Sequence, residues 1–151
     1  MEARPGDFSD PRVLELLREH LAGMHASSPP GSVYALDLTG LQHASITFVT
    51  AWDGEELLGC GALNQLDDRT GELKSMRTAA RHLRRGAAAF LLEYLIELSR
   101  RRGYARISLE TGSGPAFEPA LALYRKCGFT PGEAFGDYVA TEFNQFLHLA
   151  M

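Results

Sequence analysis

The sequence predicts one mixed α/β domain over residues 1–151, and three observations lead to this fold class. The chain has 151 residues, a usual length for one domain with its own core. Some segments repeat apolar residues at a spacing of three and four, as helices do, whereas others alternate apolar and polar residues, as strands do. No internal repeat, low-complexity segment or flexible linker divides the chain.

The first forty residues predict two helices. Asp10 followed by Pro11 is typical of a helix start, and apolar residues then recur at helical spacing over 13–24. The run SSPPGS (27–32) ends this helix, because proline and glycine interrupt the pattern. The segment VYALDLTGL (33–41) predicts a second, shorter helix.

Three strands in a meander follow these helices. Apolar and polar residues alternate from Ser45 onward, and Asp53-Gly54 is a strong signal for a two-residue hairpin. The segment DDRTG (67–71) makes the next turn. The three predicted strands cover residues 45–52, 55–66 and 72–78.

The rest of the chain predicts helix, strand, helix and strand in that order. Leu91, Leu95 and Leu98 form one stripe of the first helix, which should stop near Arg102 because Gly103 is a good residue for a helix end. The later elements are a strand over 104–110, a helix over 117–127 that Gly128 closes, and a strand over 143–151.

The composition argues against several classes of protein. A formal net charge of −4 is unlike a dedicated nucleic-acid-binding protein, which is usually strongly basic. No apolar run approaches the roughly 18 residues of a membrane span, and residues 1–10 lack the apolar core of a signal peptide. Cys60 and Cys127 belong to no metal-binding cluster, and the histidines have no ligand spacing. We expect a cytoplasmic protein with no metal site, no nucleic-acid partner and no membrane contact.

Residues 84–88 predict an anion site. A strand that turns sharply into a helix leaves the first helical N–H groups without partners, and the helix dipole makes that end positive. Gly86, Ala87 and Ala88 carry almost no side chain, so a phosphate can approach these amides closely, and Arg84 and Arg85 can bond it at the rim. The alternative is that the small residues serve close helix packing and the arginines are simply solvated.

Other phosphate-binding motifs fit less well. The chain lacks GxxxxGK[ST], so it has no Walker P-loop. The segment GSGPAF (112–117) begins like a dinucleotide fingerprint but lacks its last glycine. A small nucleotide-binding protein that uses the same turn is therefore the least attractive interpretation.

Two segments together resemble the acetyl-CoA-binding motifs of the GNAT superfamily of N-acetyltransferases. The first runs from the strand ELKSMRT (72–78) through the turn LRRGAA (83–88) into the next helix, and the second is ISLETGSGPAFEPALALYRKCGF (107–129). The end of the second, ALYRKCGF, matches the family's ALYxxxGF. The resemblance is clearest over residues 55–129. It implies an α/β (α+β) fold with a mostly antiparallel central sheet of about six to seven strands and helices on both faces.

The resemblance implies acetyl-CoA as the co-substrate. The family's phosphate-turn pattern, [QR]-x-x-G-x-[GA], lies on residues 83–88, where Leu83 replaces the first polar residue. The main chain of Met76, Arg77 and Thr78 would bond the pantetheine arm as an added strand, in a splay beside residues 104–110. An amide near Met76 would serve the oxyanion. Phe117 occupies the cofactor-binding position where the family often has Asn, so no side-chain hydrogen bond is expected there.

The resemblance also indicates a general base. Glu72 occupies the strand position where similar enzymes often carry a glutamate, and strand alternation predicts that Glu72, Lys74, Met76 and Thr78 share one face. We expect Glu72 to act through water rather than by direct contact. Glu110, at the end of the next strand, is the reserve candidate. The plain alternatives are a solvated glutamate at a strand end and a carboxylate paired with an arginine.

Tyr124 matches the tyrosine that in many of these enzymes lies near the cofactor sulfur and acts as the general acid. A phenol with a pKa near 10 can donate to a leaving thiolate. Without the motif, Tyr124 would be interpreted as a core aromatic residue.

The resemblance implies an N-acetyltransferase that moves an acetyl group from acetyl-CoA directly to a primary amine of a small molecule or peptide. No cysteine lies at a catalytic position of either motif, which argues against an acetyl-enzyme. The alternative function is a non-catalytic acyl-CoA-binding or sensing module. Amino acid, polyamine, aminoglycoside and peptide acceptors all stay open, and residues 135–138 either border the acceptor pocket or form a connecting loop. A homodimer through the terminal strands is a further implication of the family.

Overall fold

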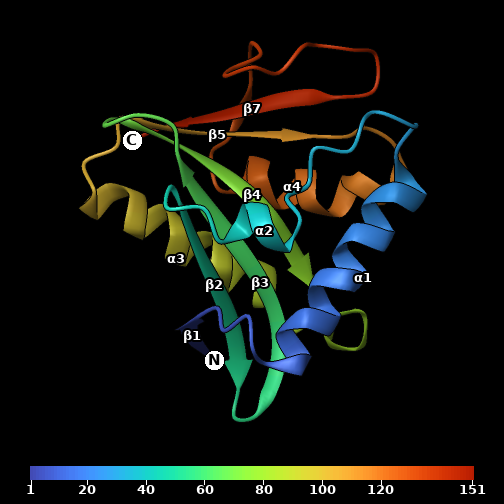
Figure 1. The fold of residues 1–151 in the computed structure, drawn as a ribbon. Helices are drawn as coiled ribbons and strands as arrows, with labels where there is room; N and C mark the ends of the chain where they lie inside the picture. The colour runs from blue at the N-terminus through green and yellow to red at the C-terminus, as the bar shows by residue number, and fades with distance from the viewer.

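The computed structural model describes all residues 1–151 as a seven-stranded sheet with helices on both faces (Figure 1). The sheet order is β1-β2-β3-β4-β5-β7-β6, and every neighbouring pair is antiparallel except β4 and β5. This confirms the fold class that the sequence predicts. The strands are β1 (Glu2–Pro5), β2 (Ile46–Asp53), β3 (Glu56–Gln65), β4 (Thr70–Thr78), β5 (Arg106–Thr111), β6 (Thr130–Pro131) and β7 (Gln145–Ala150). The helices are α1 (Pro11–Ser27), α2 (Leu38–Leu41), α3 (Ala87–Arg101) and α4 (Glu118–Lys126), with short 3-10 turns at Ala80–His82 and Pro115–Phe117.

Local sequence sets the ends of the two long helices. The Asp10 carboxylate accepts a hydrogen bond from Arg12 N at 2.9 Å and so caps the start of α1. Gly86 precedes α3 with φ +85°, and Gly103 follows it with φ +78°, both in the left-handed region that glycine tolerates best. No helix of the structure has the length and apolar character needed to cross a membrane.

Each face of the sheet carries its own apolar core. Figure 1 shows α1 and α2 in front of the sheet and α3 and α4 behind it. The core behind the sheet includes Leu63, Leu73, Leu91, Leu95, Ile107, Leu121 and Leu147. The core in front includes Val13, Leu16, Leu41, Phe48, Trp52, Cys60 and Ala62. Residues of β3 alternate between these two cores, as a strand buried on both faces requires.

The sheet is incomplete between β4 and β5. These parallel strands pair only at Thr70–Arg106, Gly71–Ile107 and Glu72–Ser108, and then diverge (Figure 1). Beyond Glu72, β4 still pairs with β3 on its other edge. The splay that the sequence analysis expects beside this strand is therefore confirmed.

A bulge in β4 overturns the predicted alternation of its side chains. Ser75 has φ +56°, and the β3–β4 register shifts opposite it, between Cys60 and Ala62. Leu73 and Met76 consequently share the face that packs on α3. The prediction that Glu72, Lys74, Met76 and Thr78 share one face is therefore wrong, because the extra residue reverses the alternation after Lys74.

Several predicted boundaries also differ from the structure. Residues 33–37 are not helical, because the Asp37 side chain accepts from Gly40 N and starts α2 only at Leu38. The hairpin turn is Gly54-Glu55 rather than Asp53-Gly54, since Asp53 still pairs with Glu56. The sequence analysis missed β1 and β6, whose four and two residues are too short for a visible alternation.

His20 is a buried titratable group on the inner side of α1. It is 5% exposed and accepts a hydrogen bond at Nδ1 from Arg77 Nε at 3.0 Å. Burial, and then the charge of Arg77, lower its pKa from 6.5 to about 4. His20 is therefore neutral at pH 7, and charging it costs native-state stability.

We expect His20 to make the free energy of unfolding fall as the pH drops from about 6.5 to about 4. The unfolded chain binds this proton more readily, so stability is fully present above the unfolded pKa and is lost toward the folded one, by about 3 kcal/mol. Urea unfolding of His20→Gln at pH 7 and pH 4.5 should show a smaller pH-dependent loss than the wild type. The exposed His25→Gln is the control. Equal losses in all three proteins would contradict this assignment.

Candidate active site

The divergence of β4 and β5 opens a cleft of about 240 Å³. Its walls come from α1, from the segment that follows α1, from both strands and from the start of α4. The lining residues are His20, Gly23, Met24, Ser27, Tyr34, Ala35, Leu73, Lys74, Ser75, Met76, Arg77, Leu109, Glu110, Thr111, Ala116, Phe117, Ala120 and Tyr124. Ten of these 18 residues are hydrophobic, and the others place several polar and charged groups in the same cleft.

Tyr124 lies in this cleft, as its predicted role requires. It is buried on α4, its ring contacts Phe129 at 5.7 Å between centroids, and its hydroxyl bonds no other group of the chain. Burial raises the pKa of Tyr124 to about 12. The phenol therefore keeps its proton at neutral pH and can donate a hydrogen bond into the cleft.

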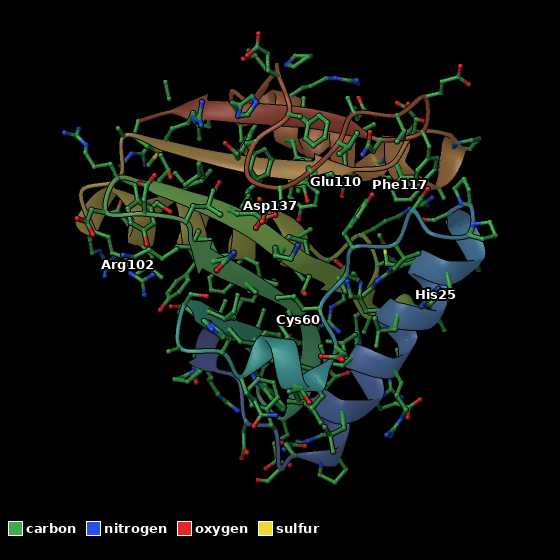
Figure 2. All side chains as sticks on the ribbon, turned by 45° about the horizontal axis from the view of Figure 1, so that its top comes forward. His25, Cys60, Arg102, Glu110, Phe117 and Asp137 are labelled. Carbon is green, nitrogen blue, oxygen red and sulfur yellow. The ribbon has the colours of Figure 1, made fainter.

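Glu110 is the carboxylate that faces the cleft. It lies on β5, beyond the last residue that pairs with β4 (Figure 2). Burial raises its pKa above the ordinary value, with a smaller contribution from Glu72. Figure 2 also shows Phe117 near it, at the start of α4, where the Phe117 ring lines the cleft and packs against Phe143 at 5.6 Å.

Glu72 lies at the point where the strands part, and three side chains surround it. Its carboxylate accepts from Asn64 Nδ2 at 3.1 Å, from Lys74 Nζ at 3.4 Å and from the Tyr138 hydroxyl at 2.5 Å. Only 5% of the Glu72 side chain is exposed, and Glu72 does not line the cleft. The structure thus brings Glu110 and Tyr124 into the cleft and leaves Glu72 behind Lys74.

Sequence reasoning missed the role of Tyr138 in this network. The sequence predicts that the segment 135–138 lies either beside the acceptor pocket or in a connecting loop, and in the structure Tyr138 of this segment reaches Glu72 across 66 positions. Lys74 Nζ donates to the Tyr138 hydroxyl at 2.6 Å, and Tyr34 packs on the Tyr138 ring at 5.3 Å. Burial and then the Glu72 carboxylate raise the pKa of Tyr138, which keeps it a donor. No local pattern in the sequence predicts the contact between Tyr138 and Glu72.

The turn before α3 keeps the geometry expected of an anion site. Arg84 and Gly86 both have positive φ, at +64° and +85°, and no side chain caps the first turn of α3. The first intrahelical bond runs from Phe90 N to Gly86 O, so the amides of Ala87 and Ala88 lack helical partners. Ala87 is 1% exposed and Ala88 is partly exposed, so the Ala88 amide is the more accessible of the two to an anion.

Arg85 differs from the predicted rim residue. Its guanidinium donates to Asp53 at 2.7 Å and to His82 Nδ1 at 2.9 Å, which ties the turn to the β2–β3 hairpin. His82 is buried beneath it rather than exposed as a lone surface histidine. Arg84 forms no ion pair and is exposed. Of the two arginines, Arg84 is the one free to meet a ligand.

The strand β4 has a free backbone edge over residues 76–78. Arg77 and Thr78 pair with Cys60 and Gly59 of β3 on one side only. On the other side, the backbone from Leu73 onward has no strand partner. An extended ligand with amide groups can therefore bond this edge as an added strand would. The structure contains no group of three or more His, Cys, Asp or Glu side chains that could hold a metal ion.

The chain matches proteins of one family by sequence and by fold. The model of the acetyltransferase (GNAT) family matches residues 12–129. The chain is 51% identical over 138 residues to the uncharacterized N-acetyltransferase YsnE of Bacillus subtilis, and the match covers 91% of each chain.

Solved structures share the fold. A putative acyl-CoA N-acyltransferase from Klebsiella pneumoniae superimposes with a TM-score of 0.81 at 23% identity, over 99% of this chain and 96% of that one. An acetyltransferase of Bacillus subtilis in complex with CoA superimposes with a TM-score of 0.73 at 20% identity, over 99% and 98%. On the family match and the sequence relative, this chain belongs to the GNAT family of acetyltransferases and is an acetyl-CoA-dependent acyltransferase.

Proposed function

We propose that the protein transfers an acetyl group from acetyl-CoA directly to a primary amine of a small molecule or peptide. One observation carries the proposal: the divergence of β4 and β5 puts a free strand edge, Glu110 and Tyr124 into one cleft. A free edge, a base and a proton donor are the three groups that such a transfer requires.

The cofactor would bind along β4 and end at α3. Its diphosphate would lie against the uncapped amides of Ala87 and Ala88, with Arg84 at the rim. The pantetheine amides would bond the main chain of Met76, Arg77 and Thr78 along the free edge of β4. This arrangement would leave the thioester near Tyr124, which lines the same cleft.

The chemistry would proceed by attack of the free amine on the thioester carbonyl. A new N–C bond forms, the carbonyl oxygen becomes an oxyanion, and a main-chain N–H near Met76 stabilises it. The C–S bond then breaks and the nitrogen gives its extra proton to a carboxylate. Tyr124 donates a hydrogen bond to the departing thiolate. Complete transfer of the phenolic proton would be uphill by about 5 kcal/mol for a thiol with a pKa near 8.5.

The cleft geometry favours Glu110 over Glu72 as the base. Glu110 lines the cleft, and its raised pKa makes it a better proton acceptor at neutral pH. Glu72, the first candidate from the sequence, already accepts three hydrogen bonds and does not line the cleft. Glu72 would then fix the point where the strands part.

Neither cysteine favours an acetyl-enzyme. Cys60 is fully buried, and burial raises the pKa of its thiol to about 12. Cys127 is outside the cleft lining. The single-domain organisation, the cytoplasmic location and the homodimer stay predictions from the sequence.

Tyr124→Phe should lower kcat about 100-fold and leave the affinity for acetyl-CoA unchanged, because it removes only the donor to the thiolate. The ring still fills its place against Phe129. Steady-state kinetics with the best amine of a panel, and calorimetry with acetyl-CoA, measure the two effects. Full turnover in Tyr124→Phe would remove Tyr124 from the mechanism.

Glu110→Gln should lower kcat/KM at pH 7 about 100-fold, and the loss should shrink toward pH 10, where the amine supplies its own free base. Glu72→Gln should change kcat/KM less than tenfold but lower the melting temperature, because it breaks a buried ion pair with Lys74. A pH–rate profile and a thermal melt of each variant test both statements. A larger loss of kcat/KM in Glu72→Gln than in Glu110→Gln would identify Glu72 as the base.

Ala88→Glu should weaken acetyl-CoA binding at least tenfold, since a carboxylate in the first turn of α3 repels the diphosphate. Stability should hold or rise slightly, because a negative charge is favourable at a helix N-terminus. Ala122→Glu, on the exposed side of α4, is the matched control. Calorimetric titration with acetyl-CoA provides the test, and unchanged affinity in Ala88→Glu would contradict the placement of the diphosphate.

A further inference from the structure

The Arg77 side chain is a cation of the cleft that the proposed chemistry does not use. The bulge at Ser75 turns it away from α3 and toward α1. There Arg77 Nε donates to His20 Nδ1 at 3.0 Å, and Arg77 Nη2 donates to the His20 carbonyl oxygen at 3.4 Å. Its guanidinium is thereby held at a fixed place in the wall of the cleft.

His20 orients this guanidinium without neutralising it. The imidazole is buried and uncharged at neutral pH, so it accepts a hydrogen bond but supplies no negative charge. An acidic residue at the same place would have formed a salt bridge and cancelled the charge of Arg77. The hydrogen bonds to His20 therefore fix a positive charge that stays available.

The chain itself provides no counter-ion for Arg77. The other permanent cation of the cleft, Lys74, has Glu72 at 3.4 Å, whereas Arg77 forms no ion pair. Glu110 is the carboxyl group that lines the cleft. Burying part of a charge without a partner is unfavourable. An anionic group of a ligand that binds beside Arg77 would offset this desolvation cost.

Gly23 leaves the space that this guanidinium occupies. A Cβ atom at Gly23 would lie 2.9 Å from Arg77 Nη2, closer than side chains approach. Glycine in the middle of a helix is less favourable than alanine. Helix α1 nevertheless has glycine at position 23, where the Arg77 guanidinium approaches the helix and leaves no room for a side chain.

We infer that the acetyl acceptor is a small primary amine that also carries a carboxylate, such as an amino acid, with the carboxylate bound by Arg77. This inference rests on the proposed direct transfer to an amine. Glu110 and Arg77 line the same cleft with opposite charges, which complements an amine and a carboxylate in one molecule. Guanidinium is well suited to a carboxylate, because its planar donors can bond both oxygens.

The same charges disfavour two acceptor classes that the sequence leaves open. A polyamine or an aminoglycoside carries several ammonium groups and no carboxylate. Such a ligand would bring positive charge against Arg77 in a partly desolvated cleft, where like charges repel strongly. Peptide amines would compete only where a carboxylate lies near the amine.

Matched acceptors test this inference. Each amino acid of a panel is compared with its own carboxamide, which keeps the amine and side chain but loses the negative charge. Spermidine and an aminoglycoside complete the panel. We expect kcat/KM for the best amino acid to exceed that for its amide at least tenfold, mainly through KM, and the polycations to be poor acceptors.

Variants then assign the preference to Arg77. Arg77→Gln should raise KM for the amino acid at least tenfold and so remove most of the preference for the amino acid over its amide. Arg77→Lys should restore part of the preference. Gly23→Ala should raise the same KM by displacing the guanidinium while it favours the helix. Arg100→Gln, at an exposed site on α3, is the control.

A binding measurement separates this inference from the proposed function. N-acetyl amino acids, the expected products, are titrated into the protein with CoA and compared with their N-acetyl amides. Tighter binding of the N-acetyl amino acids than of their amides, in the wild type but not in Arg77→Gln, supports the carboxylate subsite. If the protein acetylated no amine, the proposed transfer would be rejected, but this binding result would still support the subsite. Amine acetylation with no preference for carboxylates, or a preference that survives in Arg77→Gln, would overturn the inference and leave the proposed function standing.

Discussion

The early end of the parallel pairing between β4 and β5 is the constraint on which the site depends. If the ladder continued past Glu72 and Ser108, the backbone groups of both strands would satisfy each other and no cleft would exist. The divergence instead leaves a row of main-chain donors and acceptors on β4, open to a ligand that can replace the missing strand. Glu72, held by Asn64, Lys74 and Tyr138, fixes the vertex of this opening.

The bulge at Ser75 lets one strand serve two sides of the sheet. Its positive φ and its buried hydroxyl without a hydrogen-bond partner are unfavourable features, at roughly 1–3 kcal/mol each. In return, Met76 packs against the α3 side and Arg77 reaches α1. A regular strand would send both Lys74 and Met76 to the face of α1 and would turn Arg77 away from it. The strain therefore lies where the free edge of β4 and the part of the cleft wall formed by Arg77 are built from adjacent residues.

The sequence predicts features that depend on local patterns and misses those that depend on distant contacts. Apolar periodicity is enough to predict α1, α3, α4 and the meander of β2, β3 and β4. Two motifs in the right order are enough to indicate the family. The two residues of β6 carry no period. The bulge is visible only in the register against β3, and the contact from Tyr138 to Glu72 crosses 66 positions. Arg85 likewise pairs with Asp53, 32 positions away in the sequence. The local sequence predicts Arg85 as a residue that binds an anion, and it does not reveal this distant partner.

Charge compensation distinguishes the structural groups of the site from the groups that are left for ligands. Glu72 and Lys74 satisfy each other and have almost no exposed surface, at 5% and 10% of their side chains, so they stabilise the fold. Glu110 and Arg77 line the same cleft and form no salt bridge, and His20, which accepts a hydrogen bond from Arg77, is neutral. In a desolvated cleft an uncompensated charge interacts with a bound ligand far more strongly than it would in water. Glu110 and Arg77, which form no salt bridge within the chain, are therefore the charged groups of the cleft that are left to interact with a ligand.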